Sequence, residues 1–593
     1  MMASSRNEKG GIAHSWVIVN DDSTTENFDD STTTTEMSEQ TLKEFFVQYY
    51  FQCVLSANVS ELKEQFDRLI VACCNYNNDQ FTTHVDYTQY IIKMCLQNRD
   101  IKHGKGLAHT THMMLNTIAY YSYEEDMMPR NTLLKILKSF VIDRYNEETT
   151  LFEHPYGSWK DIKYFLDYFW VNNDYEYINV PKYDIISEII QQLYIPQMIV
   201  DRKKMSIYQP ISLCGKWLPR ESGQFAWLAK NIARQYHHEV YRVSEKNTKI
   251  YQKYRKLIAE CNTYLDTTQV HMAGNQWDRI NFDYVTSKTL FLNKSAFLNS
   301  KNNDQEHRRV CKQNFQQFIA NKENTGNYLK NNNTVMPHIL VRDALRGLNQ
   351  QNESMSVLNM QWNGLMKTLE NNEFMKYCYP CIDVSPSMMR DNSVPLHCAI
   401  GLGLACAHLS DLHRAFTFSS HPDWIQYDQD ESFVDRVYKT RNSNWGSTTN
   451  IHRLFKKILD TCLTKNENNQ TIPQSEIDKM CLIIFSDMQF DCREEQTCPE
   501  NAEAYEEEEL FDVIRREYKD AAGYDNIPFL IFWNLRTTNT FPSIEKSKNM
   551  IKLSGNSVCL LEIFMKIRLE DFKKLENWDI LKQILDHKRY ILS

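Results

Sequence analysis

Residues 381–388 read CIDVSPSM and place a D-x-S-x-S signature at the end of an apolar run. The oxygen-bearing side chains of Asp383, Ser385 and Ser387 alternate along this stretch, and a helical pattern follows directly. Side-chain oxygens of this kind suit a hard divalent cation. A loop between a parallel strand and a helix lies in the ligand crevice of an open α/β sheet. The stretch therefore predicts a metal site on an α/β fold.

Two further pieces of the same site follow in order. Residues 444–450 read NWGSTTN and lead into a helical segment, so a threonine hydroxyl stands at a helix N-terminus. Asp487 follows the very apolar run 480–486, at the carboxyl end of an expected strand. Because the carboxyl ends of parallel strands meet at one edge of a sheet, these oxygens can converge. The spacing alone allows either Thr448 or Thr449 to be this threonine.

The sequence after about residue 373 alternates apolar, strand-like runs with helical segments. We expect strands at 374–384, 414–419, 480–486 and 528–534, and helices at 394–409, 451–463 and 510–521. Continuous apolar strands between helices predict a mainly parallel sheet that is covered on both faces. Residues 373–593 are therefore expected to form a doubly wound, Rossmann-like α/β domain.

Apolar residues recur at helical spacing from about residue 39 to residue 372. Helical segments after the first are expected at 86–97, 107–121, 131–146, 160–170, 183–194, 223–260, 307–321 and 354–370. They show no repeat period, so an irregular, α-solenoid-like helical array is predicted. Residues 1–38 are rich in Ser, Thr, Asp, Asn and Glu, which predicts a disordered tail. In it, residues 16–19 (WVIV) are either a stray apolar cluster or a strand that docks on a partner.

The chain has 593 residues and a formal charge of −9, so its overall charge does not indicate a nucleic-acid-binding protein. Its 16 cysteines are scattered without a regular framework, which indicates reduced thiols in an intracellular protein. No apolar run approaches the roughly 18 residues of a membrane helix. The polar N-terminal region lacks the apolar core of a signal peptide. We therefore expect a cytoplasmic protein that contacts no membrane.

The arrangement of oxygens resembles the metal-ion-dependent adhesion site of von Willebrand factor A domains. In those domains two serines and a threonine coordinate Mg²⁺ or Mn²⁺, and aspartates ligate the ion directly or through water. The resemblance implies these ligands here: Asp383, Ser385, Ser387, Thr449 and Asp487. It also implies a protein partner that offers a carboxylate to the metal.

Pro386 departs from the pattern of these domains, which have glycine between the two serines. Proline fixes φ near −65° and removes a backbone donor, so a change in the loop geometry is expected. The alternative to a working metal site is a degenerate one, in which the same side chains only cap helices and close hydrogen bonds.

A long helical region in front of a von Willebrand A domain is the layout of TROVE-type proteins, which bind small RNAs. Four blocks more specifically resemble the domain-of-unknown-function 2828 family: NRDIKHGKG (98–106), YGSWKD (156–161), LCGKWLPR (213–220) and FSDM (485–488). That family occurs in plants, fungi and large DNA viruses, and the resemblance spans most of residues 40–570. It implies the architecture rather than an activity. For a viral member it adds the alternative of a structural, virion-associated protein with a vestigial metal site.

The helical region has one strongly basic stretch, with ten Lys or Arg residues between Ser212 and Glu260 against four acids. Interleaved tyrosines would suit phosphate contacts with base stacking, so RNA is a candidate partner. The candidate residues are Lys216, Arg220, Lys230, Arg234, Arg242, Lys246, Lys249, Lys253, Arg255 and Lys256. The alternative is a solvated helix face whose tyrosines pack inward.

Other motifs point away from catalysis. Cys378 and Cys381 have C-x-x-C spacing but lie within an expected strand, where a redox pair would not be exposed. Ser385 and Ser387 lack the G-x-S-x-G surroundings of a nucleophile. Residues 494–509 contain eight glutamates and no Lys or Arg, which predicts a solubilising loop or an internal carboxylate ligand for the metal. We therefore expect a non-enzymatic binding or scaffold protein.

Overall fold

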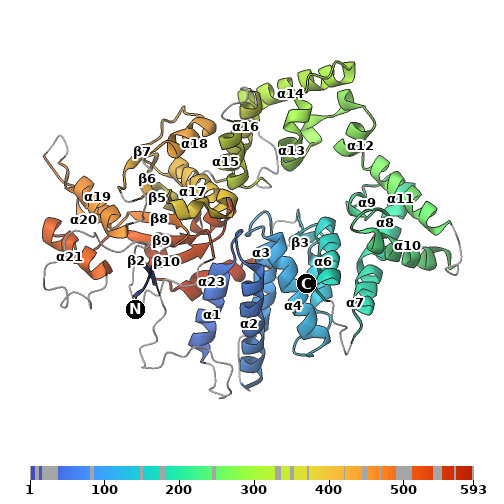
Figure 1. Cartoon of the computed structure of the whole chain (residues 1–593), viewed down its shortest axis with the longest axis horizontal. Coiled ribbons are helices and arrows are strands. Elements are labelled where there is room, and N and C mark those ends of the chain that lie inside the picture. Colours follow the sequence, from blue (N-terminus) through green and yellow to red (C-terminus); the bar gives the residue numbers. More distant parts are fainter. Residues whose placement is uncertain are drawn as a thin grey trace. The chain divides into compact units, whose positions relative to one another are not determined.

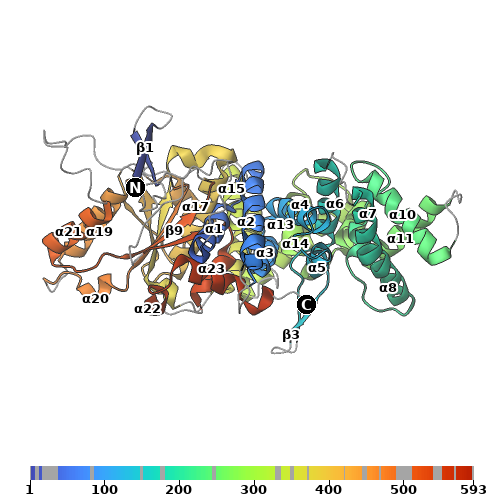
Figure 2. The ribbon, with the colours of Figure 1, turned by 90° about the horizontal axis from the view of Figure 1, so that it is seen from below.

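The computed structural model describes residues 2–6, 12–16, 38–79, 86–146, 151–173, 180–242, 249–326, 335–347, 353–369, 373–419, 421–443, 450–465, 469–488, 510–537, 550–565 and 569–590. The chain forms two compact units (Figure 1 and Figure 2). The sheet unit comprises Met1–Asn58 and Asn321–Ile584, and the helical unit comprises Val59–Ala320 and Leu585–Ser593. Among the described residues, no helix is long and apolar enough to span a membrane.

The sheet unit is built on six strands in the order β10-β9-β8-β5-β6-β7 (Figure 1). All neighbours pair in parallel except β6 and β7, which pair antiparallel at one edge. The central strands are apolar and buried along their whole length, as expected for a sheet covered on both faces. The strands are β5 (Cys378–Asp383), β6 (Arg414–Phe418), β7 (Trp424–Gln426), β8 (Cys481–Ser486), β9 (Phe529–Asn534) and β10 (Met550–Ser554).

Helix α17 (Arg390–Leu409) packs closely on β5 because its glycines let the backbone approach. A Cβ on Gly403 would lie 2.5 Å from the Ile382 side chain, and one on Gly401 would lie 2.7 Å from Pro337. The other helices of the sheet unit are α1 (Glu39–Gln52), α15 (Pro337–Arg346), α16 (Glu353–Lys367), α18 (Phe433–Arg441), α19 (Ile451–Leu463), α20 (Gln474–Ile477), α21 (Leu510–Ala522), α22 (Leu569–Phe572) and α23 (Asn577–Leu585).

Helix α1, near the start of the chain, completes the sheet unit at the β10 edge. The Ser554 hydroxyl donates to the carbonyl of Tyr50 at 3.0 Å, and the Asn534 amide donates to the carbonyl of Phe51 at 3.1 Å. These bonds bring side-chain donors to two carbonyls in the last turn of α1, where the Tyr50 carbonyl also accepts from the Cys53 N–H at 3.2 Å. The N-terminal helix is therefore part of the α/β unit although about 500 residues separate it from β10.

The helical unit consists of consecutive helices that pack on helices one to three places away in the sequence. They are α2 (Val59–Asp79), α3 (Tyr87–Arg99), α4 (Ala108–Tyr123), α5 (Thr132–Ser139), α6 (Trp159–Asn172), α7 (Lys182–Ile189), α8 (Ile195–Ser206), α9 (Cys214–Trp217), α10 (Ala226–Tyr241), α11 (Ile250–Tyr264), α12 (Thr268–Ala273), α13 (Ser287–Phe297) and most of α14 (Glu306–Thr325). A short hairpin of β3 (Arg144–Asn146) and β4 (Leu151–Glu153) interrupts the series.

Two of the sequence blocks quoted above meet in a buried ion pair. The Arg99 guanidinium donates to both carboxylate oxygens of Asp161 at 2.8 and 2.7 Å, and Asp161 also caps α6 through Ser158. Neighbouring Asp100 binds Arg589 from the end of the chain. Burial raises the pKa of Asp100, but hydrogen bonds and charge from Arg589 outweigh burial and lower it. These blocks therefore hold the helical unit together.

The expected α + α/β composition and mainly parallel sheet are confirmed, with differences in detail. The segment 131–146 is not one helix, because α5 ends at Ser139 and a strand follows. The segment 223–260 contains two helices, α10 and α11. In the N-terminal tail, β1 (Met2–Arg6) and β2 (Ile12–Trp16) pair antiparallel, and residues 17–19 lie outside the described residues.

Candidate metal site

The direction in which the chain adds strands reverses beside β5. The chain runs outward from β5 through β6 to β7 on one side, and from β8 through β9 to β10 on the other. Ligands of open α/β sheets bind at the carboxyl ends of the strands where the order reverses in this way. Asp383 ends β5, and Asp487 directly follows the end of β8. The two predicted acids therefore stand on adjacent parallel strands at the reversal.

Asp383 is fully buried and is held by both strands. Its Oδ1 accepts a hydrogen bond from the Ser385 backbone N–H at 2.9 Å, and its Oδ2 accepts one from the Ser486 hydroxyl. Burial and then the charge of Asp487 raise the pKa of Asp383 to about 7, against the opposing hydrogen bonds of Ser486 and Ser385. Two carboxylates thus share a buried site in which a cation would stabilise their charged forms.

The Ser385 and Ser387 hydroxyl oxygens lie 2.9 Å apart. In an octahedral site with Mg–O bonds of about 2.0–2.1 Å, adjacent ligand oxygens are separated by about 2.9 Å. The hydroxyl pair therefore already has the spacing of two neighbouring ligands, and all candidate donors are oxygens. This chemistry fits Mg²⁺ or Mn²⁺.

Pro386 stands at a position of the loop that tolerates proline. It is the first residue of a 3₁₀ turn over Pro386–Met389, and the Met388 N–H donates to the Ser385 carbonyl at 3.1 Å. At the first position of a helical turn the N–H has no intrahelical partner, so its absence in proline leaves no bond unmade. The two serine hydroxyls stay within hydrogen-bonding distance of each other.

The remaining parts of the predicted site lie outside the described residues. Thr449 and its alternative Thr448 fall in the range 444–449, and the acidic loop 494–509 also falls in such a range. Asn450, where the description resumes, caps α19 by accepting a hydrogen bond from the Arg453 N–H at 2.9 Å. The threonine ligand therefore stays a prediction.

Sequence reasoning missed a cation at this edge of the sheet. Arg536 follows β9, and its Nη1 lies 3.7 Å from Oδ2 of Asp487. Its Nε donates to Oδ2 of Asp391 at 3.1 Å. A guanidinium therefore stands between two carboxylates from different loops. Its position just after a parallel strand was the available signal, because that places it at the same edge as Asp383.

Metal chemistry based on histidine or cysteine finds no support in the described part of the chain. There, no group of three or more His, Cys, Asp or Glu side chains could hold a metal ion. The proposed site depends on serine hydroxyls beside two carboxylates instead. Cys378 and Cys381 are buried free thiols, and burial raises the pKa of both.

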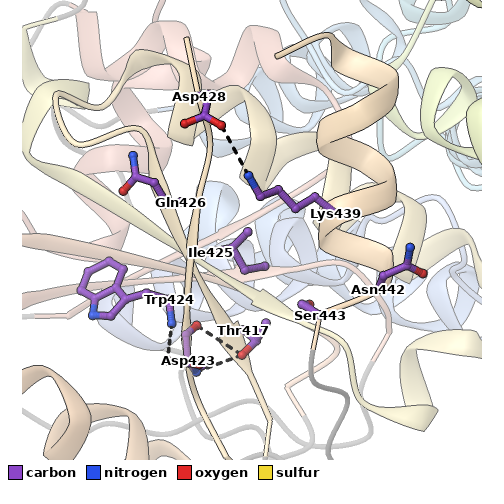
Figure 3. Close-up of a pocket in the computed structure, with 9 residues that line it drawn as sticks. All are labelled: Thr417, Asp423, Trp424, Ile425, Gln426, Asp428, Lys439, Asn442 and Ser443. Atoms are coloured by element: carbon purple, nitrogen blue, oxygen red, sulfur yellow. Dashed lines mark hydrogen bonds and ion pairs between the residues drawn. The ribbon is translucent and has the colours of Figure 1, made fainter. Parts of the chain in front are cut away.

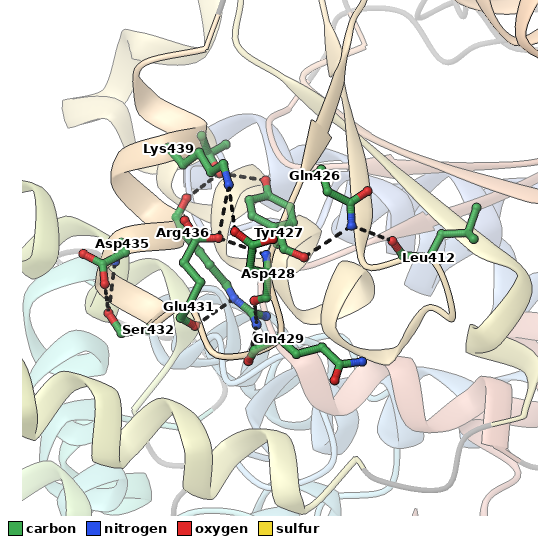
Figure 4. Close-up of polar contacts among 11 residues, drawn as sticks. Leu412, Gln426, Tyr427, Asp428, Gln429, Glu431, Ser432, Asp435, Arg436 and Lys439 are labelled. Atoms are coloured by element: carbon green, nitrogen blue, oxygen red, sulfur yellow. Dashed lines mark hydrogen bonds and ion pairs between the residues drawn. The ribbon is translucent and has the colours of Figure 1, made fainter.

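A pocket of about 670 Å³ lies at the antiparallel edge, between β7 and α18 (Figure 3). Its charged residues are paired: Lys439 lies 3.4 Å from Glu431 and 3.9 Å from Asp428. Arg436 of α18 donates to the carbonyls of Asp428, Gln429 and Glu431 (Figure 4). These contacts fix the turn that leads into α18, so the charged groups beside the pocket have a structural role.

Most of the predicted basic residues lie on α9, α10 and α11. Arg220 follows α9, Arg242 and Lys249 cap the ends of α10 and α11, and Lys246 is outside the described residues. Two of them are paired, Arg255 with Glu221 and Lys256 with Glu260. Tyr236 and Tyr254 are buried, as the alternative of inward-packed tyrosines predicted. Lys253, in contrast, lies 4.0 Å from the ring centre of the partly exposed Tyr241.

Comparisons with known proteins divide the chain near the start of β5. Residues 176–375 match the domain of unknown function DUF2828. Residues 377–588 match a second domain of unknown function, DUF7788. The match to DUF2828 is thus narrower than the expected span of 40–570, and the sheet-bearing part matches a family of its own.

The Uncharacterized protein L728 of Acanthamoeba polyphaga mimivirus is 25% identical over 489 residues, which are 80% of this chain and 76% of that protein. This relative fits the expected occurrence of the family in large DNA viruses. The crystal structure of the Deinococcus radiodurans RO (RSR) protein is 10% identical, with 90% of this chain and 94% of that chain covered at a TM-score of 0.33. A TM-score this low supports no conclusion about a shared fold.

Proposed function

We propose that the sheet unit is a von Willebrand A-type domain and that the protein is a non-enzymatic scaffold with a metal-dependent protein-binding site. The observation that carries this proposal is the meeting of Asp383, Ser385, Ser387 and Asp487 at the carboxyl ends of two adjacent parallel strands. Thr449 is proposed as the fifth member. The ion is Mg²⁺ or Mn²⁺, because every donor is an oxygen.

The residues have separate roles in this proposal. Asp383 is anchored by Ser385 and Ser486, so it supplies a fixed negative charge at the floor of the site. The hydroxyls of Ser385 and Ser387 supply two neutral ligands at the required spacing. Asp487 supplies a second negative charge. When bound, the ion offers its remaining coordination position to a carboxylate of a protein partner.

Binding is favoured over catalysis by the surroundings of the serines. The Ser385 hydroxyl lies 2.9 Å from the Ser387 hydroxyl and also bonds to the buried carboxylate of Asp383, so both serines present their oxygens around a buried negative charge, as ligands of a cation would. The consecutive helices of the helical unit suit a scaffold, because stacked helices provide an extended surface.

The test is a selection of peptides displayed on phage against immobilised full-length protein in MgCl₂, with elution by EDTA. We expect the selected peptides to share an aspartate or glutamate and to lose at least about tenfold in affinity in EDTA. Asp383→Asn keeps the shape of the side chain and removes its charge, and it should abolish the selection. Arg515→Gln on α21, whose exposed pair with Asp512 lies outside the site, is the control. Peptides that bind equally in EDTA would refute the proposal.

A further inference from the structure

Three lysines of the helical unit surround one tryptophan. The Nζ atoms of Lys160, Lys163 and Lys216 lie 5.7, 5.4 and 5.9 Å from the ring centre of Trp217. Lys163 also lies 4.6 Å from the ring centre of Phe225. Ammonium groups within about 6 Å of an aromatic face are attracted to it. The side chains of α6 and α9 thus gather positive charge around an aromatic centre.

Two of the lysines in this part of the helical unit lie at helix N-termini. Lys160 is the second residue of α6, and Lys288 is the second residue of α13. The positive end of a helix dipole favours an acid in the first turn, which α6 has in Asp161 and α13 lacks, so Lys288 weakens its own helix. Burial and then the charges of Lys160 and Arg99 lower the pKa of Lys288, and the charge of Asp161 opposes them. Helix N-termini with adjacent cations are suited to bind anions.

Acids balance the charge of the cluster only in part. Burial and then the charges of Lys160 and Arg220 lower the pKa of Lys163. In the part of the chain that the structure describes, these five cations form no ion pair: Lys160, Lys163, Lys216, Arg220 and Lys288. Asp161, next to Lys160 in sequence, is buried and bound by Arg99. A bound anion would relieve the repulsion among these charges.

We propose that this cluster binds single-stranded nucleic acid, with the lysines on its phosphates and the aromatic rings on its bases. Tyr164, which is 39% exposed, lies 5.2 and 5.1 Å from the Nζ atoms of Lys160 and Lys163 and packs edge-on against Phe225. Aromatic side chains among cations stack unpaired bases. A duplex holds its bases inside the helix, so the exposed ring of Tyr164 favours a single strand.

Two further features agree with this ligand. Four of the five cations are lysines, whereas phosphopeptides are recognised mainly by arginine clusters. A second group in the same unit repeats the chemistry, since Lys253 and Arg202 lie 4.0 and 5.9 Å from the ring centre of Tyr241. A strand longer than a few nucleotides would have a second place for phosphate and base contacts.

The experiment measures fluorescence anisotropy of labelled oligouridylate and oligothymidylate of about 12 nucleotides with the full-length protein. The variant Lys160→Gln/Lys163→Gln should bind at least about tenfold more weakly than the wild type. For single strands log K falls with log salt by about 0.7 per phosphate contact, so the slope should become shallower by about 1.4. Lys135→Gln/Lys138→Gln on α5 removes the same charge elsewhere in the helical unit and should leave affinity within about twofold.

Two more variants separate charge from stacking. Lys288→Gln tests the second helix N-terminus and should weaken binding in the same direction with a smaller change in the salt slope. Tyr164→Leu should lower affinity about fivefold or more without changing the slope, because it removes a stacking surface and no charge. Thermal unfolding checks that each variant is folded.

The proposal is overturned if the wild type shows no binding, or if the two double-lysine variants lose affinity equally. It is also overturned if a duplex of the same length, or a peptide with several phosphoserines, binds more tightly than the single strands and depends on Lys160 and Lys163. Preference between the ribose and deoxyribose oligomers identifies which single strand the site prefers.

Discussion

Arg536 neutralises part of the negative charge of the candidate metal site. Replacing it should make the stability of the protein depend on added metal. The guanidinium Nη1 lies 3.7 Å from Oδ2 of Asp487, which is fully buried, and the Arg536 side chain is 18% exposed. With an effective dielectric constant of about 20, a pair of unit charges at this distance attracts by about 4.5 kcal/mol. Arg536→Met keeps much of the apolar stem and removes the charge. The carboxylates of Asp487 and Asp383 would then share the site without a cation.

Two consequences follow from this loss of charge. Breaking a buried ion pair by removing one partner costs about 3–5 kcal/mol, so the variant should unfold at a lower temperature in EDTA. In MgCl₂ the ion no longer competes with the guanidinium. If about 2 kcal/mol of the attraction that Asp487 had for Arg536 instead stabilises the bound ion, Mg²⁺ should bind the variant at least about 30-fold more tightly than the wild type.

The assay is thermal unfolding of wild type and Arg536→Met in EDTA and in a series of MgCl₂ concentrations, with isothermal titration calorimetry for affinity. Arg515→Met removes an arginine whose pair with Asp512 is exposed, and pairs of that kind contribute about 1 kcal/mol or less. It should behave like the wild type. The reasoning is refuted if Arg536→Met is as stable as the wild type in EDTA and binds Mg²⁺ no more tightly.

Three further substitutions test contacts inside the sheet unit and inside the helical unit. Burial lowers the pKa of His338 to about 3, so the unfolded state binds an additional proton below about pH 6.5. The free energy of unfolding that depends on this neutral histidine is therefore complete above pH 6.5, and it falls by up to about 1.4 kcal/mol per pH unit toward pH 3. In urea unfolding, His338→Gln should flatten this pH dependence. The exposed His421→Gln should leave it unchanged. Arg99→Ala leaves buried Asp161 unpaired and should destabilise the helical unit by about 3–5 kcal/mol in the same assay. Gly403→Ala would place a Cβ 2.5 Å from a side chain of β5, and calorimetry should show a loss of about 1–3 kcal/mol.

The α/β part of the fold was predictable because its strands are short, continuous apolar runs. The expected strand 480–486 and helix 451–463 correspond to β8 (Cys481–Ser486) and α19 (Ile451–Leu463). Strand β7 was missed because it has only three residues, too few for a periodic signal. Strand β10 and helix α18 were missed as well. No pattern in the sequence indicated that α1 packs at the β10 edge. The apolar periodicity of an amphipathic helix does not identify the unit on which the helix packs.

The candidate site divides in the same way. Asp383, Ser385 and Asp487 were predicted because each follows directly from a strand end, and the structure brings them to adjacent strands. Arg536 was not predicted, because its contact with Asp391 joins residues 145 apart through the order of the strands in the sheet. Thr449 rests on the resemblance alone.

The cation cluster around Trp217 shows a different limit of sequence reasoning. Counting charges between Ser212 and Glu260 selected Lys216 and Arg220 but not Lys160, Lys163 or Lys288. Lys160 and Lys163 belong to α6 and approach the tryptophan only through helix packing, and the charge of Lys160 acts on Lys288 of α13. Local charge density found part of the cluster, and the tertiary structure supplied the rest.

Electron paramagnetic resonance of Mn²⁺ tests the metal site most directly, because the signal of the free ion decreases as the ion binds. The wild type should bind one Mn²⁺ per chain, and excess Mg²⁺ should release it. Asp383→Asn and Ser385→Ala should each weaken binding by at least about tenfold, while Arg515→Gln should not change it. Undiminished free Mn²⁺ in the presence of wild-type protein, or equal binding by Asp383→Asn, would contradict a metal site at the carboxyl ends of β5 and β8.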